Sequence, residues 1–553
     1  MKEKKHSNYE MDRLDEELQN LPDERTYQPQ KRQSGQRSEG QKKGEGPREN
    51  NRKKSVQEKP VREKPLSERR ARKEQKAREK EEAKKKKMTN KEFARVRYMF
   101  VTLFLVMIGY MVYFNVVKSK EVINSPYNVR QDLLAKRVVR GKILDCNGEV
   151  LAQTVTDEDG TETREYPYDD LYAHVVGYSV KGKYGIESIQ NFNLLTSNAF
   201  FLEKLAKEFK GEKNIGDNVV TTLDTKLQQA AYNALGNNKG AVVVMEASTG
   251  KILAMVSKPT FDANTVAENW EALNNDPDSS LFNRATMGQY TPGSTFKIVT
   301  TLEYLREHPD ADDAYTHYCE GSIEADGTTI HCYGQTAHGQ EDLADSVANS
   351  CNTSFSNIGL QLDKDKWKKT TEDLLFDKKI PCDLSYRESS FRLTGDSDSA
   401  ETMMTAIGQG KTVVTPYHMA MITAAIANGG TLMKPYLVDQ ITNYTGTTVK
   451  KYMPEKYADL MTSAEAAQLT EYMTDVVNYG TGTALSGESY TVAGKTGTAE
   501  VSVDKQTVHS WFVGFSNVDN PDIVVSAVVE NADTASITGT SVAKKIFNAY
   551  YYQ

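Results

Sequence analysis

Three short motifs that together could form a serine acyl-transfer site follow one another in the C-terminal half of the chain. They are Ser294-Thr-Phe-Lys297, Ser350-Cys-Asn352 and Lys495-Thr-Gly497. A serine hydroxyl is a weak nucleophile unless a base lies beside it, and a lysine serves as that base only while its amine is neutral. About two Ser-x-x-Lys matches are expected by chance in a chain this long. One such match alone is therefore weak evidence, and the prediction rests on the presence of all three motifs in this order.

The residues around Ser294 predict the start of a helix. A Pro-Gly pair precedes it, and residues 295–303 then follow the pattern of a buried helix. We expect Ser294 at the helix N-terminus, where free backbone N–H groups and the helix dipole favour negative charge. Lys297 lies three residues later, so its amine returns to the face that carries the serine hydroxyl. Burial and a second cation would lower the pKa of Lys297, and Lys495 is the candidate for that cation.

The third motif predicts an edge strand over residues 492–500 that binds an extended peptide. Gly494 and Gly497 would leave room for a ligand to approach the backbone. An extended peptide laid antiparallel to the strand would present its carboxylate to polar side chains of the motif. The residues expected to hold this carboxylate are Lys495, Thr496 and Thr498.

The remaining roles follow from what acyl transfer requires. The backbone N–H groups of Ser294 and Thr498 are the natural donors to the oxyanion. The Ser350 hydroxyl would relay a proton between Lys297 and the leaving amine, and the Asn352 amide would orient the substrate backbone. The alternative is a helix-start serine, a surface lysine and a Gly-rich turn without chemistry, which the ordered triple outweighs.

The chain resembles the class B penicillin-binding proteins over residues 130–553, well beyond the three motifs. The segments that carry the resemblance are Arg140-Gly-Lys-Ile-Leu-Asp-Cys-Asn-Gly148, Tyr184-Gly-Ile-Glu187, Asn283-Arg284, Thr291-Pro-Gly-Ser-Thr-Phe-Lys297, Gly408-Gln-Gly410, Thr415-Pro416 and His509-Ser-Trp-Phe-Val-Gly514. Cys146 departs from the family pattern, which has Arg at this place.

This resemblance implies a D,D-transpeptidase that cross-links peptidoglycan stem peptides with no metal or organic cofactor. The donor would end in D-Ala-D-Ala. Lys297 would deprotonate Ser294, which would attack the penultimate D-Ala carbonyl, and the amine of a neighbouring stem peptide would then resolve the acyl-enzyme. β-Lactams would trap Ser294. The implied partner is a polytopic glycan polymerase of the shape, elongation, division and sporulation family, and no nucleic acid is involved.

Three other functions are compatible with parts of the pattern. A D,D-carboxypeptidase or β-lactamase on the same fold would hand the acyl group to water, and turnover of a penicillin would reveal it. A penicillin sensor usually has several membrane segments. A catalytically weak structural member of a division or elongation complex would keep its function in the cell after Ser294→Ala.

Charge divides the chain into a basic tail and an acidic body. Residues 1–97 hold 31 basic and 19 acidic residues, a net charge of +12, whereas the whole chain carries −7. The tail has too few large apolar residues to form a core, so we expect disorder with transient helix over residues 66–87. Its charge suits anionic lipid or a cytoplasmic partner.

Residues 98–117 form an uncharged run that predicts a single membrane-spanning helix. At about 1.5 Å per residue such a helix spans the roughly 30 Å hydrocarbon core of a bilayer. Lys and Arg are more numerous in the segment just before this run than in the segment just after it. The N-terminus should therefore be cytoplasmic and the body extracytoplasmic, at the cell membrane. A buried helix of a soluble protein is the alternative.

The expected fold is mixed α/β and similar to the penicillin-binding and serine β-lactamase fold. An all-helical lobe would hold Ser294 and Ser350, and a mainly antiparallel sheet would present Lys495 at its edge. Apolar strands over residues 240–246, 251–257, 511–515 and 523–529 and a closing helix over residues 541–551 build this sheet layer. The expected domains are a tail at 1–97, a membrane helix at 98–117, a pedestal at 118–217 and the transpeptidase domain at 218–553. The pedestal is too short for a glycosyltransferase domain.

Five cysteines are too few for a disulfide framework in a body of this size. Cys319 and Cys332 flank a predicted loop and could pair outside the cell. Three histidines nearby also permit a metal site, but the spacing fits no strong zinc pattern, so free or paired thiols are favoured. These histidines are His317, His331 and His338. We expect the side chain of Cys351 to turn into the helical lobe.

Overall fold

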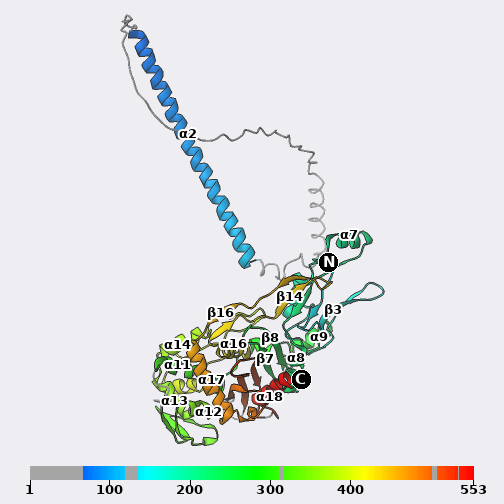
Figure 1. The fold of residues 1–553 in the computed structure, drawn as a ribbon, viewed down its shortest axis with the longest axis vertical. Helices are drawn as coiled ribbons and strands as arrows, with labels where there is room; N and C mark the ends of the chain where they lie inside the picture. Colours follow the sequence, from blue (N-terminus) through cyan, green and yellow to red (C-terminus); the bar gives the residue numbers. More distant parts are fainter. Residues whose placement is uncertain (1–65, 119–134, 310–314, 501–506, 534, 553) are drawn as a thin grey trace, which may run out of the picture. The chain divides into compact units, whose positions relative to one another are not determined.

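The computed structural model describes residues 66–118, 135–309, 315–500, 507–533 and 535–552 (Figure 1). Of the tail predicted over residues 1–97, residues 1–65 lie outside the described residues. The chain divides into two units, residues 1–101 and 102–553, and each is considered by itself.

The apolar run predicted at residues 98–117 belongs to a long helix, α2 (Leu66–Tyr113), followed by a π-turn at Phe114–Lys118. Within the described residues, this helix is long and apolar enough to cross a membrane. Residues 66–97, expected in the disordered tail, are helical. Their Glu, Lys, Arg and Ala have high helix propensity. Adding turns to an existing helix avoids the cost of a new nucleus, so the apolar helix extends toward the N-terminus.

A five-stranded antiparallel sheet forms the centre of the catalytic domain, as expected. Its strand order is β17 (Val492–Glu500), β18 (Val508–Ser516), β19 (Val524–Val529), β7 (Gly240–Met245) and β8 (Ile252–Lys258). Every neighbouring pair is antiparallel. The predicted edge position of the strand that carries the third motif is confirmed, because among the described residues β17 pairs with β18 alone.

Helices cover both faces of this sheet. Side chains alternate between faces along a strand, so Val242 and Val244 pack under α8 (Thr225–Leu235) and α18 (Gly539–Tyr551), which lie side by side in Figure 1. The intervening residues of β7 face α16 (Pro416–Ala427). Since α16 lies between the sheet and the helical lobe, its residues Pro416–Ile426 are all buried. The expected mixed α/β fold is confirmed, with helices on both sides of the sheet.

The helical lobe follows β8 in the chain. Its helices are α10 (Arg284–Met287), η2 (Gly293–Phe296), α11 (Lys297–Glu307), α12 (Leu343–Ala348), α13 (Asn352–Gln361), α14 (Lys364–Asp373), α15 (Ser399–Ala406), α17 (Ser463–Asn478) and η4 (Thr483–Leu485). Helix α9 (Val266–Asn274) packs against pedestal residues instead, including Tyr178 and Tyr184. Strands β13 (Thr431–Met433) and β16 (Lys456–Asp459) form a separate antiparallel pair.

The expectation of an all-helical lobe is wrong for residues 317–341. Two small antiparallel sheets lie there, formed by β9 (His317–Cys319) with β12 (Gly339–Glu341) and by β10 (Ser322–Ala325) with β11 (Thr328–His331). The β10–β11 turn is an Asp-Gly pair with positive φ at both residues, +48° and +78°. Asp-Gly is a strong two-residue hairpin signal, so the sequence itself indicates this turn.

The pedestal contains a second sheet that draws on distant parts of the chain. Its order is β15 (Thr448–Lys451), β14 (Val438–Thr442), β6 (Asn218–Thr221), β2 (Ile143–Leu144), β3 (Val150–Thr156) and β4 (Glu162–Glu165). We expected residue 218 to begin the catalytic domain, whereas β6 lies in the pedestal sheet. Strands β14 and β15 join it from the transpeptidase half. The remaining elements are β1 (Val138–Val139), α5 (Gly185–Ile189), α6 (Asn191–Leu194), α7 (Phe201–Lys210) and β5 (Asn214–Ile215).

A buried ion triad connects two of the segments that carry the family resemblance. Glu187 is fully buried and pairs with both Arg140 and Arg164, the latter at 2.7 Å. Burial raises the pKa of the Glu187 carboxyl, but the charges of the two arginines outweigh it and the pKa ends below its usual value. The triad fixes α5 against β4 and against the start of the pedestal.

Candidate active site

The predicted site residues come together at one cleft of about 740 Å³. Six of the eight line it, namely Ser294, Ser350, Asn352, Thr496, Gly497 and Thr498. The two lysines, Lys297 and Lys495, are fully buried. The helical lobe therefore provides the first two motifs and the sheet edge provides the third.

Ser294 lies in a tight 3-10 turn, η2, and the α-helix begins only at Lys297. We expected the α-helix to start at residue 295. Side chains three residues apart eclipse in a 3-10 turn, so Ser294 and Lys297 still project to the same side. Gly293 has φ +54°, and its N–H donates to the Gly408 carbonyl at 2.9 Å. A Cβ on Gly408 would lie 1.9 Å from the Gly293 oxygen, so the turn depends on this close approach.

The Lys297 amine makes hydrogen bonds to the second motif. Its Nζ donates to the Ser350 carbonyl at 2.6 Å, to the Ser350 hydroxyl at 3.2 Å and to Asn352 Oδ1 at 2.7 Å. Burial lowers the pKa of Lys297 to about 8. Roughly a tenth of the amine is then neutral at pH 7, so the group can act as a base.

The second motif adopts a turn with an uncommon backbone conformation. Ser350 links α12 and α13 with φ +54°, a region that non-glycine residues enter only when the surrounding structure holds them there. Cys351 then caps α13 by accepting from the Ser354 N–H. The Asn352 amide donates to the His331 carbonyl at 2.9 Å, which leaves its Oδ1 for Lys297.

Lys495 belongs to β17, its side chain is fully buried, and its Nζ donates to the Thr496 carbonyl at 3.2 Å. Burial, and then the charge of Lys297, lower the pKa of Lys495 well below its usual value. We expected the influence in the other direction, with Lys495 lowering the pKa of Lys297. For Lys297 burial is the main cause, and nearby cysteines and Glu341 oppose it.

The glycines of β17 make room for protein rather than for a ligand. A Cβ on Gly497 would lie 2.9 Å from Thr295 Cγ2 and 3.0 Å from Trp511 Cβ. One on Gly494 would meet the Phe512 ring at 2.5 Å. Because these two glycines have no side chain, β17 packs directly against the η2 turn that carries Ser294 and against the neighbouring strand β18.

Thr496 and Thr498 keep contact with the cleft. Thr496 shares a hydrogen bond of 2.6 Å with the hydroxyl of Thr481, which also lines the cleft and was not predicted. Thr481 is held by its N–H, which donates to the Ala348 carbonyl at 3.0 Å. A Gly-Thr-Gly run at residues 480–482 is the sequence signal that could have identified Thr481.

A second unpredicted contact fixes the nucleophile segment to the sheet. Glu530 accepts from Arg284 Nε at 2.8 Å and from the Tyr290 hydroxyl at 2.6 Å. Trp511 Nε1 donates to the Thr291 carbonyl at 3.1 Å. Glu530 lies 246 residues after Arg284, so no local pattern identifies it.

The comparisons with known proteins agree with this geometry. The family model for the penicillin-binding protein transpeptidase domain matches residues 240–552, and the model for the penicillin-binding protein A dimerisation domain matches residues 140–219. The peptidoglycan D,D-transpeptidase PbpA of Mycolicibacterium smegmatis is 35% identical over 437 residues, covering 74% of this chain and 88% of that protein.

Solved structures give the same picture. Penicillin-binding protein A from M. tuberculosis, in its ceftriaxone acyl-enzyme complex, has a TM-score of 0.69 and 31% identity, covering 76% of this chain and 100% of that chain. A D,D-transpeptidase domain of a peptidoglycan glycosyltransferase from Eggerthella lenta has a TM-score of 0.68 and 35% identity, covering 75% and 99%.

Proposed function

This chain belongs to the class B penicillin-binding proteins and is a serine peptidoglycan D,D-transpeptidase, and we propose that its acyl-enzyme forms on Ser294. The observation that carries the assignment is the buried Lys297 amine, whose pKa is lowered to about 8 and which lies between the Ser350 hydroxyl and Asn352. A base of this kind, three residues from a serine that opens onto the cleft, is what acyl transfer requires.

Acylation begins when neutral Lys297 takes the proton from the Ser294 hydroxyl. The serine oxygen bonds to the carbonyl carbon of the penultimate D-Ala, and the negative charge that develops on the carbonyl oxygen is held by the backbone N–H groups of Ser294 and Thr498. The Ser350 hydroxyl, 3.2 Å from the Lys297 amine, gives its proton to the nitrogen of the last D-Ala and takes the proton that Lys297 received from Ser294. The peptide bond breaks and the donor stays on Ser294 as an ester.

The same groups then work in reverse order. Lys297 and Ser350 remove a proton from the amine of a second stem peptide, which attacks the ester carbonyl and frees Ser294. Thr496 and Thr498 contact the donor carboxylate from the sheet edge, and the Asn352 amide orients the donor backbone. Lys495 is fully buried and its pKa is lowered well below its usual value, so we assign it a positioning role within β17 through its hydrogen bond to the Thr496 carbonyl.

Acylation of the full-length protein by a penicillin, followed by peptide mapping, tests the role of Ser294. Cleavage after Arg284 and Lys297 releases a peptide of residues 285–297 in which Ser294 is the sole serine. We expect a stable adduct on this peptide, its loss in Ser294→Ala and its retention in Ser489→Ala, which replaces an exposed serine.

The other outcomes point to the alternatives. An adduct on a different residue contradicts the assignment of Ser294. An unmodified protein with unchanged penicillin indicates a scaffold role, and rapid hydrolysis of the penicillin indicates a β-lactamase.

We propose further that residues 98–117 cross the cell membrane once and that the basic segment before them stays in the cytoplasm. This rests on the length of α2, its apolar run and the excess of basic residues before it. A polytopic glycan polymerase would supply the strands to be cross-linked. A single cysteine placed at residue 60 should resist a membrane-impermeant maleimide in intact cells, and one at residue 320 should react. The reverse labelling pattern contradicts this topology.

A further inference from the structure

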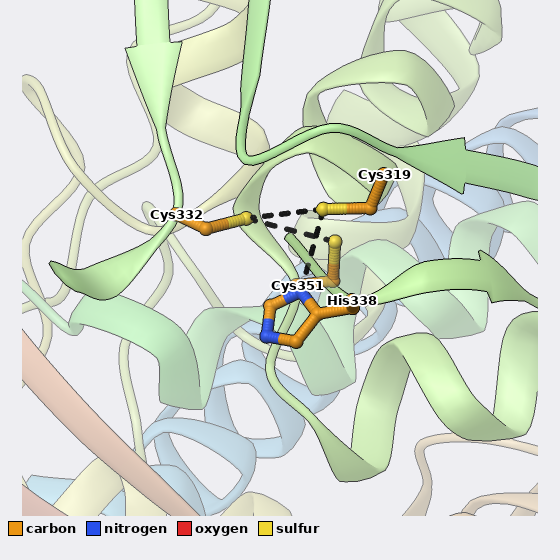
Figure 2. A group of neighbouring side chains, drawn as sticks. All are labelled: Cys319, Cys332, His338 and Cys351. Carbon is orange, nitrogen blue, oxygen red and sulfur yellow. Dashed lines mark hydrogen bonds between the residues drawn. The ribbon is translucent and has the colours of Figure 1, made fainter. Parts of the chain in front are cut away.

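Four side chains that can ligate a metal converge beside the active site, and Figure 2 shows them facing one another. They come from four separate segments. Cys319 ends β9, Cys332 follows β11, His338 precedes β12, and Cys351 caps α13. The three cysteines are buried and form a cluster of their own, apart from the main core. His338 closes the group from the side, with 18% of its side chain exposed.

The distances between the donor atoms fit a tetrahedral ion. The Cys332 sulfur lies 3.7 Å from the sulfur of Cys319 and 3.7 Å from that of Cys351. His338 Nδ1 lies 3.4 Å from the Cys319 sulfur, and all four donor atoms lie within 4.8 Å of one another. Zinc bonds of about 2.3 Å to sulfur and about 2.1 Å to nitrogen place tetrahedral neighbours about 3.6 to 3.8 Å apart.

The arrangement singles out no disulfide. Cys332 is equally far from both other sulfurs, and all three thiols are free in this structure. Pairing any two of them would leave the third thiol and the imidazole without a role. Three thiolates and one imidazole are instead a common ligand set of closed, structural zinc sites.

We propose that Cys319, Cys332, His338 and Cys351 bind one thiophilic divalent ion of the zinc class. The three cysteines are far apart along the chain, so the pattern lacks the closely spaced cysteine pair of a short metal-binding knuckle. This spacing is the reason that the sequence favoured free or paired thiols. Binding displaces the thiol protons to solvent and forms one bond from each of the three sulfurs and from the imidazole to the ion.

The ion would connect two segments that shape the catalytic cleft. Cys351 lies between Ser350 and Asn352, which both accept a hydrogen bond from Lys297. Cys332 follows His331, whose carbonyl accepts from the Asn352 amide. With four ligands from protein the site is closed to substrate, so the ion positions residues and takes no part in acyl transfer. It fixes the strained Ser350 turn and one wall of the cleft, which includes His331, Cys332 and His338.

Metal analysis of the full-length protein, purified in detergent without chelators or metal-affinity resin, tests the proposal. We expect about one zinc per chain. Removal of the ion by a strong chelator should expose thiols to a thiol reagent and slow acylation by a penicillin about tenfold or more, and added zinc sulfate should reverse both effects. Cobalt in place of zinc should give the near-ultraviolet charge-transfer band of thiolate ligation. The metal content and this band are independent of the proposed role of Ser294.

Variants locate the site. Cys351→Ser and His338→Ala should each lower the zinc content about tenfold or more, while Cys146→Ser, which replaces an exposed cysteine, should keep both zinc and acylation. If a ligand variant fails to fold, the cobalt spectrum of the unaltered protein still decides. The proposal is overturned in favour of a disulfide if the protein holds no metal and two of the three thiols stay unreactive toward the thiol reagent until a reductant is added. Zinc that persists in both ligand variants, or a cobalt spectrum without the thiolate band, overturns it as well.

Discussion

The pH dependence of acylation is the sharpest test of Lys297 as the base. Burial lowers the pKa of its amine to about 8, and the neutral amine is the reactive form. Below that pKa the neutral fraction falls about tenfold per pH unit, to roughly a tenth at pH 7 and roughly a hundredth at pH 6. The second-order rate of acylation by a penicillin should therefore rise about tenfold from pH 6 to pH 7 and level off above about pH 8.

Lys297→Arg provides the decisive variant. A guanidinium stays protonated over this range, so the rate should fall by about 10² to 10⁴ and its rise with pH should disappear. Lys366→Arg is the matched control, because the Lys366 side chain is 64% exposed and lies outside the site. Its profile should match that of the unaltered protein.

The measurement is the rate of labelling of the full-length protein by a fluorescent penicillin, followed at several concentrations from pH 6 to pH 9. The penicillin carboxylate keeps its charge over this range, so the slope reports on the protein. A rate that is independent of pH, or that falls as the pH rises, would refute the reasoning. Retention of the sloping profile in Lys297→Arg would assign it to another group.

Two further substitutions test the packing that supports the site. Glu187→Gln leaves two buried guanidinium groups without their anion and should lower the free energy of unfolding by about 3–5 kcal/mol in a denaturant titration. Glu165→Gln, at an exposed position, should change it by about 0.5 kcal/mol or less. Gly408→Ala places a Cβ 1.9 Å from the Gly293 carbonyl at φ +74° and should slow penicillin acylation about tenfold or more. Gly395→Ala has open space and should leave the rate unchanged; equal rates for both variants would contradict the argument.

Local spacing was enough to predict a set of residues that the structure gathers at one cleft. The Ser-x-x-Lys pair works because residues three apart share a side of a helical turn, whether the turn is α or 3-10. The sheet strands were equally accessible, since buried apolar runs with turn signals between them predict β7, β8, β18 and β19 closely. The edge position of β17 followed from the third motif, and the mainly antiparallel sheet followed from the family resemblance.

Other features were beyond local patterns. The pairing of β14 with β6 joins two distant parts of the chain, Val438–Thr442 and Asn218–Thr221, and Glu530 reaches Arg284 across 246 residues. The small sheets at residues 317–341 carry short strands with a weak alternation, and their Asp-Gly turn was the one clear signal. The four candidate metal ligands likewise come from separate segments, with Cys319 first and Cys351 last.

The sequence by itself determined the chemistry: which side chains can serve as nucleophile, base and proton relay, because those roles need particular residue types at short, fixed spacings. Only the tertiary structure decided how these groups behave. The depth at which Lys297 and Lys495 lie sets their pKa values, and the gathering of Cys319, Cys332, His338 and Cys351 creates a set of ligands from separate segments. The lysine pKa values and the gathering of the four ligands both depend on which distant segments pack together and exclude water. Burial of that kind is a property of tertiary packing rather than of local sequence.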